Sequence, residues 1–417
     1  MVDCCKNLKL TIELCENAVM NAFDKKWRRD TTLRLINKYG GVTREEIETE
    51  IKEGKLWARL EAVHGIACEV MQRVEDLVDG YADDLDLEPV KKTKRVDGLS
   101  MKERELTRES AMQQIFDHLA VLGLMPLFRA KIIPWQFASI PGRGQTGGAR
   151  QLHRWLNKKR PKTKHAEKVD VHHAFQSIHG DVIMALMRED IPRAFWQLAL
   201  VGALLATDPD GALLIGSYLS AWLFNYVMSK FLRHLLDLRK SRRGEERKLV
   251  DRLLAYMDDV AVFADRLADL LMALKRGGKW LEKNLGLELK PERKTVTFLT
   301  VEEERSRRKA TRPAARGCPG LDMMGYVVHR TYITIRPRVF LKARRQFLRA
   351  GRELEATGRI PRFRCYKLVS HYGPFKHSDS RRAQENLDVQ NLVKIAKATI
   401  ARTERYRTMK QKGVILP

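Results

Sequence analysis

The first quarter of the chain has apolar residues at helical spacing. This pattern runs from Leu8 to Tyr39 and ends at Gly40-Gly41. Thr43-Arg44-Glu45-Glu46 then reads as a capping box that opens a second helix, and Lys55 to Val78 predicts a third. We therefore expect residues 1–97 to form a helical extension, and we find no motif in it that indicates chemistry.

The middle of the chain combines strand and helix patterns. The apolar runs Leu253-Leu254-Ala255 and Val260-Ala261-Val262-Phe263-Ala264 flank a polar turn, which predicts a β-hairpin. Ala212 to Ser229 is apolar for almost the thickness of a bilayer, but glycine, serine and asparagine interrupt it, so we predict a buried helix and no membrane span. Leu267 to Asn284 predicts an amphipathic helix, in which Gly277-Gly278 is a candidate break.

The last part of the chain is strongly charged. Glu302 to Lys309 predicts a charged loop. From Arg336 onward the chain is basic and predicts helices, which Ser370 to Ser378 separates. Basic helices of this kind fit the phosphate backbone of a nucleic acid.

Charge and cysteine content narrow the class of partner. The 417 residues carry a formal net charge of +26, and the isoelectric point is about 9.9. So many positive charges repel one another, and such an excess usually serves to bind an anionic partner. Nucleic acid is the first candidate for this partner, and a membrane surface is the second. The six cysteines form no CxxC pair, which argues against a zinc ribbon or a disulfide framework and favours a reducing cytoplasm. The N-terminus has no apolar signal region.

The candidate chemistry lies in the turn of the predicted hairpin. Tyr256-Met257-Asp258-Asp259 puts two adjacent carboxylates where a hairpin normally carries Asn-Gly or Asp-Gly. A divalent cation such as Mg²⁺ would remove their mutual repulsion. Upstream, Asp170 ends a short apolar stretch, far enough away for helices to intervene and return a second strand. Two such strands could hold two metal ions about 3.5–4 Å apart, the arrangement used in phosphoryl transfer.

In this order the motifs resemble those of reverse transcriptases. Asp170 with Phe175 matches the first catalytic motif of the palm, and Tyr256-Met257-Asp258-Asp259 matches the catalytic hairpin. The glycine-rich segment Ser139 to Gly148 resembles bacterial and phage enzymes, especially those of diversity-generating retroelements and phage-defence groups. The segment Ile215 to Asn225 resembles the next palm motif, although Leu214, Ile215 and Ala221 depart from the usual residues and leave the subgroup open.

The resemblance implies an α+β fold shaped as a right hand, with an antiparallel palm. Residues 98–335 would form the fingers and palm, and residues 336–417 a basic helical thumb and C-terminal tail. It also implies RNA-directed DNA synthesis with two Mg²⁺ ions, which Mn²⁺ could replace.

The roles that the resemblance assigns fall into three groups. The metal site would consist of Asp170, Asp258, Asp259 and the carbonyl of Val171. The nucleotide would contact Phe175, Ile215, Gly216, Lys290, Arg104 and Arg108. Template and primer would contact Arg143, Tyr256, Met257, Met324, Gly325 and Tyr326.

The implied partners are an RNA template or non-coding RNA, a DNA primer or cDNA product, and deoxynucleoside triphosphates. A protein partner or a second copy of the chain stays open, and so does the choice between phage defence and a diversity-generating retroelement. Two other functions also remain. One is an untemplated or protein-primed nucleotidyl transferase of the same fold. The other is a non-catalytic RNA-binding subunit, against which the intact Asp170, Asp258 and Asp259 argue.

Overall fold

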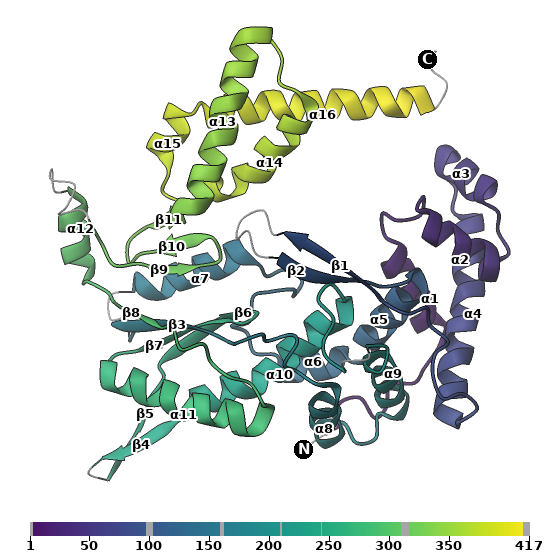
Figure 1. Ribbon diagram of the computed structural model, residues 1–417, viewed down its shortest axis with the longest axis horizontal. Helices are drawn as coiled ribbons and strands as arrows, with labels where there is room; N and C mark the ends of the chain where they lie inside the picture. Colours follow the sequence, from purple (N-terminus) through teal and green to yellow (C-terminus); the bar gives the residue numbers. More distant parts are fainter. Residues whose placement is uncertain are drawn as a thin grey trace. The chain divides into compact units, whose positions relative to one another are not determined.

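Figure 1 shows a computed structural model of the chain, which describes residues 3–96, 103–158, 162–208, 211–242, 244–309 and 317–411. The chain forms two compact units, and each unit combines segments that are distant in sequence. The first unit comprises Met1–Ser139, Val171–Leu235 and Lys275–Lys290. The second comprises Ile140–Asp170, Leu236–Leu274 and Pro291–Pro417.

The first unit begins with four helices. They are α1 (Ile12–Phe23), α2 (Asp30–Gly40), α3 (Arg44–Glu53) and α4 (Trp57–Asp79). The capping box is confirmed, since Thr43 accepts from the amide of Glu46 and the Glu46 carboxylate accepts from the amide of Thr43. The predicted pattern from Leu8 to Tyr39 contains two helices, because the chain turns between them and Lys25 adopts a φ of 58°.

The next elements of the first unit are a β-hairpin and a series of helices. These are β1 (Lys91–Val96), β2 (Glu103–Arg108), α5 (Ala111–Gly123), α6 (Met125–Lys131), α8 (Gly180–Asp190), α9 (Phe195–Leu205) and α10 (Tyr218–Asp237). The predicted helix from Ala212 is wrong over its first six residues, because α10 begins only at Tyr218. The amide of Leu214 instead donates to Ser220 Oγ, and the turn at Gly216 ends at Ser217.

Helix α11 (Leu267–Leu285) is continuous, so the predicted break at Gly277-Gly278 is wrong. A Cβ atom added at Gly277 would lie 2.4 Å from Cδ2 of Leu235. Glycine is therefore present at this position because α11 packs closely against α10, and it does not interrupt the helix.

The second unit contains a four-stranded antiparallel sheet in the order β6-β7-β3-β8. The strands are β6 (Arg252–Tyr256), β7 (Asp259–Ala264), β3 (His165–Asp170) and β8 (Lys294–Thr297). Trp155 of α7 (Gln145–Leu156) packs edge-on against Phe263 of β7, with ring centroids 6.2 Å apart.

The same unit has a hairpin of β4 (Arg239–Arg242) and β5 (Glu245–Lys248), and a small sheet in the order β11-β10-β9. The strands of that small sheet are β9 (Leu321–Met323), β10 (Tyr326–Val328) and β11 (Ile333–Ile335).

The predicted charged loop from Glu302 to Lys309 is wrong, because these residues form most of helix α12 (Val301–Lys309). Its first turn is capped, since Thr300 Oγ1 accepts from the amide of Glu303 and the Glu303 carboxylate accepts from the amide of Thr300. Glu304 is buried and accepts from the amides of Arg330 and Thr331. These hydrogen bonds hold α12 in place, although its sequence is too charged to predict a packed helix.

The C-terminal part of the second unit is helical, as predicted. It consists of α13 (Pro337–Thr357), α14 (Arg362–Lys376), α15 (Arg381–Asn386) and α16 (Val389–Gln411) around a shared apolar core. The predicted separator from Ser370 to Ser378 is wrong, because α14 continues to Lys376 through Pro374. The buried ring of Phe375 holds this last turn in the core. None of the helices that the structure describes is long and apolar enough to cross a bilayer.

Candidate active site

The three predicted catalytic carboxylates lie at one end of the four-stranded sheet. In the pairing of β3 with β7, Asp170 is directly opposite Asp259. Tyr256 pairs with Asp259 across the hairpin, so Met257 and Asp258 form its two-residue turn. Asp170, Asp258 and Asp259 are each half-buried. Two carboxylates directly opposite each other weaken a sheet, which indicates a functional reason for the pair.

The turn itself carries strain. Met257 has a φ of 53°, at a position where hairpin turns normally have glycine. A side chain in this region costs about 1–3 kcal/mol, and such residues cluster at active sites. The surrounding structure therefore holds the turn that presents Asp258 in a backbone conformation that Met257 does not favour by itself.

The donor set suits a hard divalent cation. Carboxylate oxygens are the ligands that Mg²⁺ and Mn²⁺ prefer, and Mg²⁺ typically takes one or two carboxylates together with substrate phosphates. Within the described part of the chain, no three His, Cys, Asp or Glu side chains are placed so that they could together hold a metal ion.

A family model described as reverse transcriptase (RNA-dependent DNA polymerase) matches residues 111–328, just over half of the chain. This chain belongs to the reverse transcriptase family. Membership implies an RNA-directed DNA polymerase, which confirms the enzyme class expected from the motifs. No curated protein matches the chain. The matched range includes the carboxylates at 170, 258 and 259, whereas α1 to α4, the β1-β2 hairpin and α13 to α16 lie outside it.

In the first unit of the reverse transcriptase, a cavity of about 260 Å³ adjoins Ile215. Its lining residues are Lys92, Glu105, Thr107, Gln176, Asp208, Ala212, Leu213, Leu214 and Ile215. The amide of Thr107 donates to the carbonyl of Ile215 over 2.9 Å. Gly216 has a φ of 119°, and a Cβ there would lie 3.1 Å from the Thr107 carbonyl oxygen. Glycine is thus required where β2 approaches this segment.

The register of the β1-β2 hairpin decides which basic residues face this cavity. Lys92 pairs with Thr107, and its ammonium lies 3.0 Å from Asp208 Oδ1. Arg108 pairs with Lys91 and Arg104 with Arg95, so positions 104 and 108 belong to the opposite face of the hairpin. Arg108 is exposed there, and the side chain of Arg104 lies outside the described residues. The structure thus does not bring Arg108 to the cavity.

The segment after Asp170 is fixed within the first unit. Val171 is buried and forms a β-bridge with Leu289, and the amide of His172 donates to the carbonyl of Glu288. Lys290, the predicted triphosphate contact, ends this same segment and is half-buried. Phe175 stacks on Phe224, with ring centroids 4.6 Å apart and planes 5° from parallel. The ring of Phe175 is therefore held in one orientation.

The predicted primer-grip segment forms a hairpin in the second unit. Met323 pairs with Tyr326 across a turn made of Met324 and Gly325, both with positive φ. Met324 and Tyr326 are buried, and the amide of Arg336 donates to the carbonyl of Gly325. In the same unit Arg143 is exposed, in the loop before α7.

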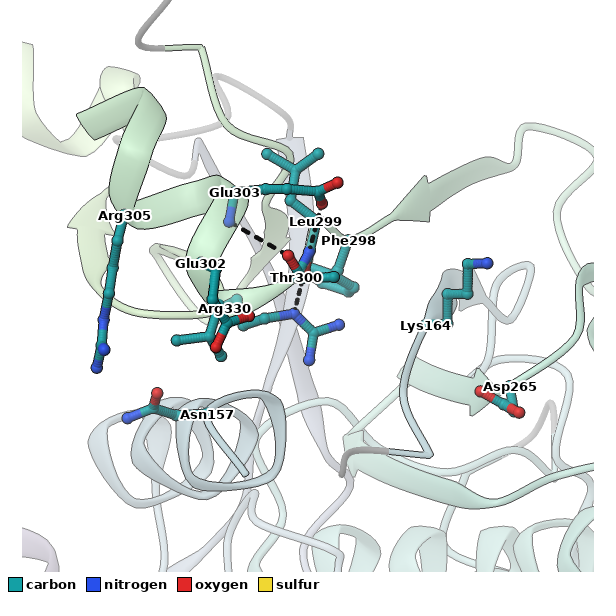
Figure 2. Close-up of a pocket in the computed structure, with 11 residues that line it drawn as sticks. Asn157, Lys164, Asp265, Phe298, Leu299, Thr300, Glu302, Glu303, Arg305 and Arg330 are labelled. Carbon is teal, nitrogen blue, oxygen red and sulfur yellow. Dashed lines mark hydrogen bonds between the residues drawn. The ribbon is translucent and has the colours of Figure 1, made fainter. Parts of the chain in front are cut away.

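A larger cavity of about 850 Å³ lies at the other end of the same sheet (Figure 2). Its lining includes Lys164, which precedes β3, and Asp265, which follows β7. Strands β3 and β7 begin and end there respectively, so this end is opposite to Asp170 and Asp259. None of the predicted site residues lines it.

Sequence reasoning missed Lys168, Lys92 and Asp208. Lys168 Nζ lies 3.0 Å from Asp259 Oδ1. Its only sequence signal is its place two residues before Asp170, which puts both on one face of a strand. Lys92 belongs to the basic run from Lys91 to Arg95. Only the register of the hairpin shows which residues of this run face the cavity. Asp208 carried no motif.

Proposed function

We propose that this reverse transcriptase copies RNA into DNA with two Mg²⁺ ions held by Asp170 and Asp258. Asp259 supports the site, and the carbonyl of Val171 assists. The observation that carries the proposal is the pairing of Asp170 with Asp259, next to Asp258, at one end of a sheet. Bound Mg²⁺ would activate the 3′-oxygen of the primer and stabilise the leaving pyrophosphate. The chain itself contributes positioning and a fixed arrangement of charge.

The other predicted site residues would contact the nucleotide, the primer and the template. The cavity beside Ile215 and Gly216 takes the incoming deoxynucleotide, with Lys290 toward the triphosphate. Met324, Gly325 and Tyr326 hold the 3′ end of the primer, while Tyr256, Met257 and Arg143 contact the primer and template. The basic helices α13 to α16 follow the duplex, in keeping with the net charge of +26.

Lys92, rather than Arg104 or Arg108, is the hairpin residue that we expect to meet the triphosphate. The Lys92→Met variant should raise the KM for deoxynucleotides about 10- to 100-fold, the worth of one charge-assisted contact. Arg108→Met is the matched control, because it removes one charge from the opposite face of the same hairpin. Steady-state incorporation kinetics test this, with melting temperatures to show that both variants fold. A larger KM effect for Arg108→Met would contradict it.

Phe175 should exclude ribonucleotides by crowding their 2′-hydroxyl. The stacking on Phe224 keeps the ring from moving aside. We therefore expect Phe175→Ala to lower the preference for deoxynucleotides about 10- to 100-fold, measured as the ratio of kcat/KM values for the two substrates. The Phe175→Tyr variant keeps the ring and should keep the preference. An unchanged ratio in Phe175→Ala would assign the ring to packing alone.

The biological setting that we propose is a bacterium or phage, with the enzyme in the cytoplasm and bound to a dedicated RNA. Phage defence and a diversity-generating retroelement both fit the sequence motifs, and the helical extension α1 to α4 is available to an RNA or protein partner. A template repeat beside the gene would indicate the retroelement. A structured non-coding RNA without such a repeat would favour defence.

Incorporation of labelled deoxynucleotides by the purified protein tests the function. One reaction supplies an RNA template and a DNA primer, and the other contains only RNA that co-purifies with the protein. A product complementary to the supplied RNA supports the proposal, and synthesis with co-purified RNA alone supports a dedicated RNA. A homopolymer product would instead show an untemplated transferase.

A further inference from the structure

A lysine shares the face of the sheet that carries the catalytic carboxylates. Lys168 and Asp170 are two residues apart on β3, so their side chains leave the same face. The Lys168 ammonium donates to Asp259 Oδ1 over 3.0 Å. The side chains of Lys168 and Asp259 are only 32% and 24% exposed. The ion pair is thus a fixed part of the carboxylate cluster and is partly shielded from water.

We propose that Lys168 acts as a positioning residue that neutralises Asp259 and leaves Asp170 and Asp258 as the metal ligands. The inference rests on the proposed metal-dependent function of the three carboxylates. Asp170 and Asp259 are directly opposite each other, and Asp258 precedes Asp259 in the turn. Lys168 balances one of these negative charges, and its ammonium occupies an oxygen of Asp259.

The consequence concerns metal binding without a nucleotide. Removing one positive charge from this end of the sheet increases the attraction for a divalent cation. Lys168 therefore weakens metal binding to the empty enzyme, so that substrate phosphates supply the missing negative charge. In this arrangement Asp259 acts on the metal only through its charge, which offsets that of Lys168.

The sheet offers a matched control for the charge. Lys294 of β8 is directly opposite Lys168 of β3 and is exposed. It lies one strand farther from Asp259, since β3 stands between β7 and β8. Lys294→Met removes the same charge from the same face, but not the contact with Asp259.

The experiment is a titration of the full-length protein with Mn²⁺ in the absence of nucleotide, with free Mn²⁺ measured by its electron paramagnetic resonance signal. We expect Lys168→Met to bind Mn²⁺ about three- to tenfold more tightly than the wild type, as for loss of one partly shielded ion pair. Lys294→Met should change the affinity less than about twofold, because its charge is more distant. Lys168→Arg keeps the charge and should bind like the wild type. Melting temperatures without metal show that each variant folds.

A second arm separates Asp259 from Asp258. Asp259→Asn alone should weaken Mn²⁺ binding about three- to tenfold, because the charge of Lys168 is then unbalanced, and the Lys168→Met/Asp259→Asn double variant should bind like the wild type. Unchanged or weaker Mn²⁺ binding by Lys168→Met would overturn the inference. So would an Asp259→Asn loss as large as that of Asp258→Asn. If Asp258→Asn binds Mn²⁺ like the wild type, the proposed metal site itself fails, and that outcome is distinguishable from failure of the role of Lys168 alone.

Discussion

Replacing Asp258 with asparagine should abolish DNA synthesis and leave the protein folded. Asp258 lies in the two-residue turn of the β6-β7 hairpin and is half-buried, so an isosteric amide fits the same space. The amide carries no charge and binds a hard cation poorly, which would remove the electrostatic basis of the proposed two-metal catalysis. We expect incorporation to fall by at least about a thousandfold, in keeping with losses at single catalytic groups. Labelled deoxynucleotide incorporation with Mg²⁺ measures this.

Asp265→Asn is the matched control for that experiment. Asp265 follows the same strand, at the end away from the turn at Asp258, and is exposed. Figure 2 shows it among the residues that line the larger cavity. It should retain incorporation within about twofold, as expected for a surface substitution. Synthesis by Asp258→Asn at a tenth of the wild-type rate or more would remove Asp258 from the catalytic role, provided that both variants melt like the wild type.

Replacing Asp190 with alanine should destabilise the first unit by about 3–5 kcal/mol, the typical cost of breaking a buried ion pair on one side. The Asp190 carboxylate is fully buried at the end of α8. It lies 2.6 Å from the ammonium of Lys131 and 2.7 Å from that of Lys230, and the Tyr226 hydroxyl donates to it over 2.7 Å. Alanine would leave two largely buried ammonium groups without this carboxylate. Thermal unfolding followed by circular dichroism measures the effect.

Asp181→Ala provides the control on the same helix, because Asp181 is exposed in the first turn of α8. It should cost less than about 1 kcal/mol, the range of a charge at a helix terminus. A loss of similar size in both variants would show that the Asp190 network contributes no more than an exposed charge does.

The Asp190 network should also make stability depend on acid. Burial alone would raise the pKa of Asp190, but hydrogen bonds from Lys131, Lys230 and Tyr226 outweigh it, and the pKa lies below its usual value of 3.8. A carboxyl with a lowered pKa in the folded state stabilises the fold above its unfolded pKa, and this contribution is lost as pH falls through the folded pKa. The difference in unfolding free energy between wild type and Asp190→Asn should therefore be constant above about pH 5 and shrink below about pH 4.

The sequence alone determined what depends on neighbours along the chain. The capping box at Thr43 and the hairpin around Asp258 follow from residues within a few positions of one another, where local hydrogen bonds and the period of the pattern decide the structure. The order of the carboxylate motifs along the chain also identified the family, since this order can be read without knowing which residues are in contact. The same local reasoning failed for α12, whose helix depends on the burial of Glu304 against residues 330 and 331.

The tertiary structure decided everything that depends on register and on distant partners. Whether Lys92 or Arg108 faces the cavity follows from which residues pair across the β1-β2 hairpin, and a shift of one residue would exchange the two faces. The contact of Lys168 with Asp259 joins residues on two strands, and Asp190 meets lysines from α6 and α10. The residues next to each partner do not indicate such contacts, because the sequence between the two partners can have any pattern of polar and apolar residues. Only the folded arrangement brings their charges together.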